Sequence, residues 1–391
     1  MQTIPFNKPY VAGKELYYIA QTVAQGKISG DGHFTQECAR LLQDRFGIHR
    51  VLLTPSCTAA LEMAAMLCDV NPGDEVILPS FTFVSTANAV VRLGAKPVFV
   101  DIRSDTLNID DSLIENAITP KTKAILPVHY AGVACEMDRI MTIAKKYDVM
   151  VVEDAAQAVN ASYNGRALGS IGHMGTYSFH DTKNFVCGEG GVFRQSAPQL
   201  VDRAEIIRDK GANRRQFLRG QVDKYTWVDI GSSYVPSEIC SAFLYAQLEM
   251  MDEINERRRK HYEFYNRNLK ALEAEGLLQL PRIPEDCSSN SHIFWIILPD
   301  ASTRDALMAH LRNNGITAVF HYIPLHSSVM GKKFGYQDSD LPVTEDLSSR
   351  LLRLPLYFEM TEEDQRRVVM VLTEFLRRAA IRLPAHSEIL N

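Results

Sequence analysis

The sequence predicts an α/β protein that combines a large domain, built on a mainly parallel sheet flanked by helices, with a small α+β C-terminal domain. Short apolar runs alternate with amphipathic helical segments through the first two-thirds of the 391 residues. This alternation is typical of βαβ crossovers, in which helices cover both faces of a parallel sheet. The pattern changes after Gly231. We therefore place a boundary near residue 250, with the large domain over residues 1–250 and the small domain over residues 251–391.

The predicted strands of the large domain are short apolar runs separated by segments of helical periodicity. The strands cover residues 51–53, 75–79, 97–101, 124–128 and 149–154. The helices between them cover residues 58–67, 84–93, 109–117 and 137–146. Two further strands, at residues 176–179 and 191–193, enclose a glycine-rich turn.

The small domain is expected to follow one long helix over residues 238–270. Strands are predicted at residues 293–297 and 315–319, with a helix over residues 303–313 between them. A closing helix covers residues 361–378, with Thr361 as its N-cap and acidic residues in its first turn, where they favour the helix dipole.

Composition excludes several classes of protein. The net charge of −5 gives no general attraction to nucleic acid, and no apolar run is long enough to cross a bilayer. The seven cysteines include no CxxC pair, which argues against a zinc site and a disulfide framework. We expect no metal, no nucleic-acid or membrane partner, and a cytoplasmic protein with reduced thiols.

Side chains that could bind a ligand or take part in catalysis follow several of the predicted strands. Asp154 ends the strand at 149–154, where a carboxylate serves either as a ligand group or as a helix N-cap. The stretch 54–61 is a strand, a turn and a helix that opens with hydroxyls, which is an anion site or simple capping by Ser56 or Thr58. Phe81 and Phe83 follow another strand and suit either the core or a stacking contact.

The stretch SFHDTKNFVCGEGG, residues 178–191, adds an amine to this set. Lys183 follows a predicted strand and precedes a turn that contains Gly188, Gly190 and Gly191. Most lysines on loops are only solvated, but glycines here let the backbone approach another group closely. An amine, a phosphate site, an aromatic plate and a carboxylate are jointly explained by pyridoxal 5′-phosphate (PLP). The lysine binds its aldehyde, the carboxylate keeps its ring nitrogen protonated, and the helix N-terminus holds its phosphate.

Several stretches of the sequence resemble one family, the PLP-dependent aminotransferases of nucleotide-linked keto-sugars, which have the aspartate-aminotransferase-like fold. The similarity runs along nearly the whole chain and is carried by PSCTAALEMAA, PSFTFVSTANA, VVEDAAQ, SFHDTKN, GEGG, HYIPLH and RLPL. Within the family, VHYAGVACEMD and RGQVDKYTWVDIGSSY are similar to the members that form dTDP-4-amino-4,6-dideoxygalactose. Some relatives carry histidine in place of the lysine and catalyse dehydration or deoxygenation, and Lys183 argues against that branch.

The resemblance implies a role for each matching residue. Lys183 is the lysine that binds the PLP aldehyde, Asp154 is the partner of the ring nitrogen, and His180 is a further catalytic candidate beside the cofactor. The implied cofactor contacts are Gln157 at the ring hydroxyl, Phe83 on the ring, and Cys57, Thr58 and Ser178 at the phosphate. Relatives often send an Asn and an Arg across a subunit interface from a GxNxR pattern. This chain has Ser233 and Val235 at those positions, so that phosphate contact is expected to be weaker.

The resemblance also implies the reaction. L-glutamate would donate an amino group, the cofactor would cycle through pyridoxamine 5′-phosphate (PMP), and C4 of a dTDP-4-keto-6-deoxyhexose would accept the amine in a homodimer with active sites at the subunit interface. The galacto product is expected, with the gluco product or another nucleotide-linked keto-sugar as alternatives. Enterobacterial common antigen and a glycosylated natural product are both open as its destination. The expected substrate contacts are Lys210, Arg214, Arg219, Tyr322 and His326.

Two other classes of protein fit the sequence less well. A nicotinamide-dependent dehydrogenase or epimerase of nucleotide sugars requires GxGxxG after the first strand, where this chain has Pro55-Ser56-Cys57-Thr58. A non-catalytic regulator with the PLP fold requires loss of the lysine or an attached DNA-binding segment, and the sequence shows neither.

Overall fold

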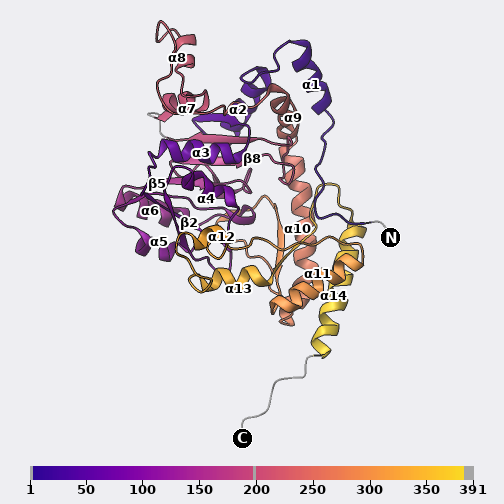
Figure 1. Cartoon of the computed structure of the whole chain (residues 1–391). Helices are drawn as coiled ribbons and strands as arrows, with labels where there is room; N and C mark the ends of the chain where they lie inside the picture. Colours follow the sequence, from indigo (N-terminus) through magenta and orange to yellow (C-terminus); the bar gives the residue numbers. More distant parts are fainter. Residues whose placement is uncertain (1–2, 197–199, 383–391) are drawn as a thin grey trace.

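The structure is a computed structural model that describes residues 3–196 and 200–382 (Figure 1). Its centre is a seven-stranded sheet in the order β1-β9-β8-β5-β4-β2-β3. Strand β9 runs antiparallel to both of its neighbours, and every other pair of neighbouring strands in this sheet is parallel. The predicted mainly parallel sheet is therefore confirmed. Its strands are β1 (Arg50–Thr54), β2 (Glu75–Pro79), β3 (Lys96–Val100), β4 (Thr122–Ile125), β5 (Met150–Asp154), β8 (Met174–Ser178) and β9 (Gly191–Gln195).

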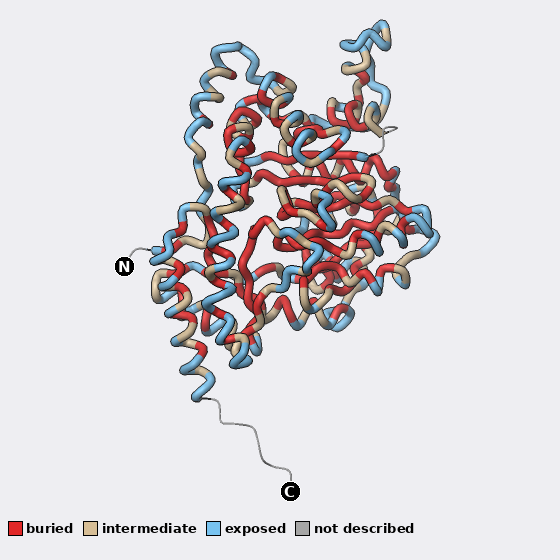
Figure 2. Tube along the Cα trace, turned by 180° about the vertical axis from the view of Figure 1, so that it is seen from behind, coloured by how far each residue is buried: buried red, intermediate tan, exposed pale blue. Residues whose placement is uncertain are grey.

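Helices cover both faces of this sheet because alternate residues of each strand point to opposite faces. Leu53 and Val151 pack with helices α2, α5, α6 and α9 on one face, whereas Leu52 and Val152 pack with α3, α4 and α7 on the other. The strands consequently form the buried band in the middle of Figure 2. These helices are α2 (His33–Phe46), α3 (Cys57–Leu67), α4 (Val84–Val91), α5 (Asp111–Ala117), α6 (Met137–Tyr147), α7 (Val201–Arg208) and α9 (Glu238–Glu249).

The C-terminal third forms its own core around a two-stranded antiparallel sheet, β11 (Phe294–Ile297) and β12 (Leu351–Leu354). Its helices are α10 (Met251–Ala274), α11 (Ala301–Asn313), α12 (Val329–Lys332), α13 (Pro342–Arg350) and α14 (Glu362–Arg382). The remaining elements are α1 (Glu15–Ala24), α8 (Arg214–Leu218), the 3₁₀ helix η1 (Tyr130–Gly132), and a small sheet of β6 (Ser162–Tyr163), β7 (Arg166–Ala167) and β10 (Cys287–Ser288).

Two local predictions differ from the structure, and the predicted capping by Thr361 agrees with it. The long helix predicted over 238–270 is two helices that meet at Met250, whose backbone leaves the helical region. The strand predicted at 315–319 makes only isolated bridges, from Ile316 to Ile4 and from Val319 to Arg353. Thr361 accepts a hydrogen bond from the backbone N–H of Asp364 over 3.1 Å, as a capping residue does.

The extreme N-terminal segment packs with the C-terminal core rather than with the large sheet. Ile4 pairs with Ile316 and is buried among residues of that core. The boundary near residue 250 stays a prediction, and Ile4 shows that the two cores do not divide the chain at a single point. In the part of the chain that the structure describes, no helix is long and apolar enough to cross a membrane.

A buried polar network lies within the large sheet, directly beneath Asp154. Glu153 is fully buried, 2.8 Å from both His129 Nε2 and Arg194 Nη2, and accepts backbone hydrogen bonds from residues 169, 171 and 172. The backbone N–H of Cys135 donates to His129 Nδ1, so His129 donates from Nε2. Burial raises the pKa of Glu153, but the hydrogen bond from His129 and the charge of Arg194 outweigh it and lower the pKa to about 2.

We expect Glu153→Gln to lower the free energy of unfolding at neutral pH by about 3 kcal/mol, because Arg194 is then buried without a counter-ion. The folded-state pKa lies below the ordinary value of 4.5. The carboxylate therefore contributes stability above about pH 4.5 and loses it as the pH falls through about 2. Urea unfolding at several pH values measures this. The exposed pair of Glu362 with Arg366 supplies the control, since Glu362→Gln should change stability by less than about 1 kcal/mol.

Candidate active site

The sheet brings the candidate residues to one edge. Thr54, Asp154 and Ser178 end β1, β5 and β8, and Gly191 begins the antiparallel β9 opposite both Thr54 and Ser178. The carboxyl ends of the parallel strands and the amino end of β9 therefore meet at the same place. Ligands in open α/β sheets bind at this edge.

Lys183 lies in the connection between β8 and β9. Its backbone N–H donates to the carbonyl of His180 over 2.9 Å, which fixes a turn. Among the residues that the structure describes, its Nζ has no hydrogen-bond partner and no ion pair. Burial lowers the pKa of Lys183, while the nearby Asp154 and Cys57 act in the opposite direction and Arg353 lowers it further. The amine is thus partly desolvated and unengaged, as a nucleophile or proton carrier requires.

Asp154 is buried beside this amine. Thr86 Oγ1 donates to Oδ2 over 2.8 Å, and the backbone N–H of Ala156 donates to Oδ1 over 3.1 Å. Both contacts fix the orientation of the carboxylate. The carboxylate can still accept from a further donor, because each oxygen has two lone pairs. The sequence motif did not single out Thr86, although it lies in the quoted stretch PSFTFVSTANA.

The N-terminus of α3 forms a cradle against the start of β9. Ser56 caps α3 by accepting from the backbone N–H of Ala59 over 3.1 Å, and Thr58 donates to Ser85. The backbone amides of Cys57 and Thr58, at the start of this helix, have no intrahelical acceptor and are available to an anion. A Cβ at Gly191 would lie 2.4 Å from the backbone nitrogen of Cys57, so only glycine lets β9 approach this closely.

The other two glycines of the turn have different reasons. A Cβ at Gly190 would lie 2.4 Å from Cys187 Sγ, and Gly188 has a φ of +80° in open space. The glycine cluster thus serves close packing at two positions and a left-handed backbone at one.

We expect Gly191→Ala to weaken the affinity for PLP at least tenfold, because the new methyl group displaces the first turn of α3 by overpacking worth about 1–3 kcal/mol. Titration of the apoprotein with PLP, followed by absorbance, measures this. Gly188→Ala is the matched control, since it strains the backbone without entering the cradle. Equal PLP affinities for the two variants would contradict the cradle.

Gln157, Tyr322 and Phe83 line the adjoining part of the edge. Gln157 Oε1 accepts from the backbone N–H of Ala131 over 2.7 Å, and its Nε2 donates to the hydroxyl of Tyr322 over 3.0 Å. The ring of Phe83 is 57% exposed and lies 6.3 Å from that of Tyr322, whereas Phe81 is in the core. The structure thus brings Tyr322, from the C-terminal third, into contact with Gln157.

A hydrogen-bonded chain ties the lysine turn to the C-terminal third. Asn184 Nδ2 donates to the carbonyl of Asn290 over 2.8 Å, and its Oδ1 lies 2.9 Å from His292 Nδ1. Burial, and then the charge of Lys183, hold the pKa of His292 well below its usual value, so the imidazole is neutral. Sequence patterns did not reveal this contact, because its members are more than a hundred residues apart.

The two predicted histidines have other surroundings. His180 lies within 2.9 Å of Thr182 and Asp181 and 3.7 Å from Glu189, on the outer side of the turn. His326 is fully buried, 2.7 Å from Ser80 Oγ and 3.2 Å from Glu345. The structure gives neither imidazole a contact with Lys183 or Asp154, and their functional roles stay predictions.

Apart from Ser178, which ends β8, the remaining predicted residues lie on the arm around α8. Ser233 is exposed and bridges to Asp209, and Ser178, at the sheet edge, is buried. Lys210 pairs with Asp209, and Arg219 pairs with Asp202 and Glu205. Arg214 is exposed, and in the described part of the chain it has no ion pair. The structure does not bring the side chains of Ser233, Lys210, Arg214 and Arg219 to Lys183 within one chain.

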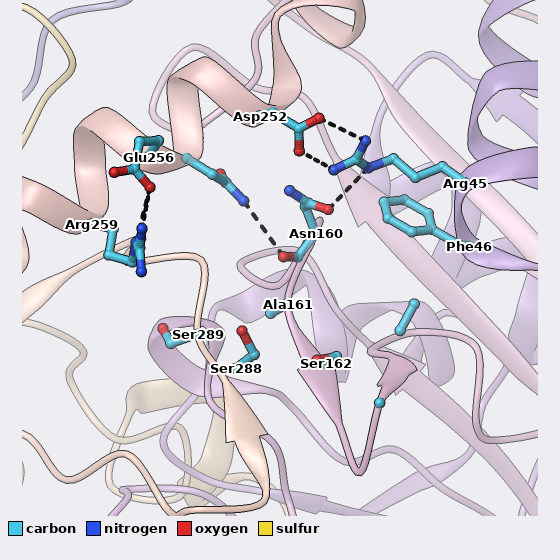
Figure 3. A pocket seen from close by; sticks show the side chains of 13 residues that line it. Arg45, Phe46, Asn160, Ala161, Ser162, Asp252, Glu256, Arg259, Ser288 and Ser289 are labelled. Atoms are coloured by element: carbon cyan, nitrogen blue, oxygen red, sulfur yellow. Dashed lines mark hydrogen bonds and ion pairs between the residues drawn. The ribbon is translucent and has the colours of Figure 1, made fainter.

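A hollow of the described surface, with a volume of about 750 Å³, lies elsewhere (Figure 3). Arg45, Asn160, Asp252 and Glu256 are among its lining residues, and none of the predicted site residues is. Its cations are already paired, Arg45 with Asp252 and Arg259 with Glu256. Within residues 3–196 and 200–382, no cluster of metal-ligating side chains is present.

Comparison with known proteins gives consistent results. Residues 9–373 match the sequence model of the DegT/DnrJ/EryC1/StrS aminotransferase family. The chain is 39% identical to a pleiotropic regulatory protein of Geobacillus stearothermophilus over 82% of this chain and 83% of that protein. It is 31% identical to the spore coat polysaccharide biosynthesis protein SpsC of Bacillus subtilis, over 96% and 98% of the two chains.

Solved structures share the fold. The aminotransferase TlmJ of Streptoalloteichus hindustanus superposes with a TM-score of 0.89 at 29% identity, over 96% of this chain and 100% of the other. A Streptococcus pneumoniae protein solved in its PLP form gives a TM-score of 0.88 at 26% identity, over 96% and 99% of the chains. The same protein in its PMP form gives a TM-score of 0.90. The predicted aminotransferase fold is confirmed.

Proposed function

Because this chain belongs to the DegT/DnrJ/EryC1/StrS aminotransferase family, it is a sugar aminotransferase that uses PLP and cycles it through PMP, and we propose that it transfers an amino group from L-glutamate to C4 of a dTDP-4-keto-6-deoxyhexose. The proposed products are 2-oxoglutarate and dTDP-4-amino-4,6-dideoxygalactose. The enzyme class and the cofactor agree with the sequence-based expectation, while the two substrates and the galacto configuration form the proposal.

The observation that carries the proposal is the unengaged amine of Lys183 within electrostatic reach of the buried carboxylate of Asp154. The surrounding donors suit PLP. The α3 cradle with Gly191 fits a phosphate, Asp154 fits a protonated ring nitrogen, and the exposed ring of Phe83 fits a stacking contact. Gln157, which is hydrogen-bonded to Tyr322, would be the residue beside a ring hydroxyl. When bound, PLP withdraws electrons from the carbon that carries the amino group and so makes a proton on that carbon removable.

Side chains of this protein carry out the proton transfer and hold the reacting groups in place. Lys183 would hold the cofactor through Nζ when no substrate is bound, and as a free amine it would take the proton from the α-carbon of the amino donor and pass it on toward the cofactor, with the opposite transfer for the second substrate. Its lowered pKa keeps the amine unprotonated at a lower pH than that of an ordinary lysine. Thr86 and Ala156 hold Asp154 in place, and the chain of Asn184 and His292 holds the turn of Lys183.

We further propose that the working unit is a homodimer with the site at its interface. Helix α1 and the arm around α8 project from the body in Figure 1 and are largely exposed in Figure 2. Both expose large apolar side chains, Leu16 at 77% and Trp227 at 78%. Such exposure is typical of surfaces that a partner covers. Ser233 then contributes to the cofactor site across that interface, and Lys210, Arg214 and Arg219 lie on the same arm. Light scattering on the holoenzyme tests the dimer, and a monomeric active enzyme would contradict it.

The direct experiment is incubation of the holoenzyme with L-glutamate and dTDP-4-keto-6-deoxyglucose, followed by NMR of the product. An axial amine at C4 identifies the galacto product, and an equatorial amine identifies the gluco alternative. Conversion of neither substrate would overturn the proposed reaction.

A further inference from the structure

Residues 4–10, which we call the N-terminal strap, run between the C-terminal core and α1 as part of the indigo segment of Figure 1. At the start of the strap, Ile4 is buried in that core, and its backbone N–H donates to the carbonyl of Gly315 over 2.8 Å. At the other end, Gln247 Nε2 of α9 donates to the carbonyl of Tyr10 over 2.9 Å. The strap is therefore fixed at both ends, and the residues between them have a defined position.

Side chains of the strap also pack on the connection between β12 and α14. Lys8 pairs with Glu359, and the ring of Tyr10 stacks on that of Phe358 with the centroids 3.8 Å apart. The strap therefore contacts the C-terminal third of the chain at several points, although it comes first in the sequence.

Asn7 lies between these contacts and reaches the turn of Lys183. Its Nδ2 donates to the carbonyl of Asp181 over 3.1 Å. Because the backbone N–H of Lys183 donates to the carbonyl of His180, residues 180–183 form a β-turn with Asp181 at its second position. The carbonyl of Asp181 then belongs to the central peptide group, whose rotation distinguishes a type I turn from a type II turn. Asn7 thus holds the one peptide group of this turn that could flip.

The other side of Lys183 is held by the same part of the molecule. Asn184 bonds to the carbonyl of Asn290 and to His292, which directly precede β11 of the C-terminal core. Both flanks of Lys183 are consequently held by segments packed on that core. A lysine side chain is a flexible four-carbon stem, so its backbone must be held firmly if Nζ is to lie within reach of a reacting carbon.

We propose that Asn7 is a positioning residue of the aminotransfer reaction, which holds the central peptide group of the Lys183 turn and so directs Nζ toward the reacting carbon. This inference rests on the proposed role of Lys183. It gives the strap a function, because the strap makes the orientation of the lysine depend on the C-terminal core.

The test compares three variants of Asn7 with the wild type. We expect Asn7→Ala to lower kcat of the half-reaction with L-glutamate about tenfold, as the loss of one hydrogen bond does, while the KM changes less than about twofold because Asn7 does not bind the donor. Asn7→Gln keeps the amide donor and should recover part of the loss. Asn7→Asp has no donor and should recover none.

A second readout does not depend on turnover. The rate at which the apoprotein captures PLP in a borohydride-fixed form should fall by a similar factor in Asn7→Ala and Asn7→Asp. Hydrogen exchange of the backbone amides at residues 181–184 should become faster in the same two variants, because the turn is then free to flip.

Lys8→Ala is the matched control, because it removes an exposed ion pair from the same strap and leaves Asn7 in place. An unchanged capture rate in Asn7→Ala overturns the inference, and so does an equal loss in Lys8→Ala, which would show only a loosened strap. If the wild type forms no borohydride-fixed adduct at Lys183, the proposed function fails and this inference fails with it. An adduct at Lys183 that forms equally fast in every Asn7 variant removes the role of Asn7 alone.

Discussion

Replacement of Lys183 by alanine is expected to lower kcat by at least about 10³-fold, because it removes both the covalent tether and the group that moves the proton. PLP should still bind through the α3 cradle and Asp154, but borohydride should no longer fix it to the chain. Single-turnover absorbance after addition of glutamate measures the rate, and mass spectrometry after borohydride reduction measures the tether. Lys210→Ala, which removes a lysine paired with Asp209 on the arm, should retain the tether.

The lowered pKa of Lys183 adds a second readout. Burial disfavours the ammonium form, so the amine stays reactive toward the PLP aldehyde at a lower pH than an ordinary lysine does. We expect the rate at which apoprotein captures PLP to fall only below that lowered pKa. A rate that follows an unshifted lysine, or a borohydride-fixed adduct in the alanine variant, would show that Lys183 is not the tether.

Asp154→Asn should lower kcat by about 10²- to 10³-fold, which corresponds to about 3–4 kcal/mol of lost transition-state stabilisation. Asparagine keeps the shape of the side chain but cannot keep a ring nitrogen protonated, so the bound cofactor becomes a poorer acceptor of electrons. Steady-state kinetics measure the loss, and the absorbance of bound PLP shows that the site is still occupied.

Thr86→Val is a milder variant that tests the same carboxylate. It removes the hydroxyl that donates to Asp154 Oδ2 and leaves the charge in place. The loss should therefore be near tenfold, the size of one hydrogen bond to a charged group. Retention of more than a tenth of the wild-type kcat in Asp154→Asn would contradict the role of the carboxylate.

Much of the large sheet could be predicted because buried parallel strands are short apolar runs with helices between them. β2, β3 and β5 follow this pattern closely. The strands of the small sheet were harder to predict from the sequence. The apolar run 315–319 pairs only through Ile316 and Val319, whereas β12 was noticed only as part of a motif. The break at Met250 was hidden because apolar periodicity continues across it without a glycine or proline.

The residues of the site also fall into two groups, those that a local sequence pattern predicts and those that it does not. Asp154, Lys183 and the α3 cradle are each signalled by a local pattern of strand, turn and helix, and their meeting follows from parallel strands. Thr86, His292 and Asn7 carry no such signal, because their contacts join segments far apart in the sequence. Three-dimensional packing had to be known before they could be identified.

The reversal of β9 has one more consequence. Lys183 and Gly191 belong to a single hairpin, with Ser178 opposite Gly191 at its base. Lys183 and Gly191, which are proposed to bind opposite ends of the cofactor, are therefore separated by one short run of chain. This separation limits the length of a molecule that can contact both. We therefore expect that pyridoxal without its phosphate, or an analogue with a longer phosphate arm, cannot contact both residues at once and does not form a reactive complex.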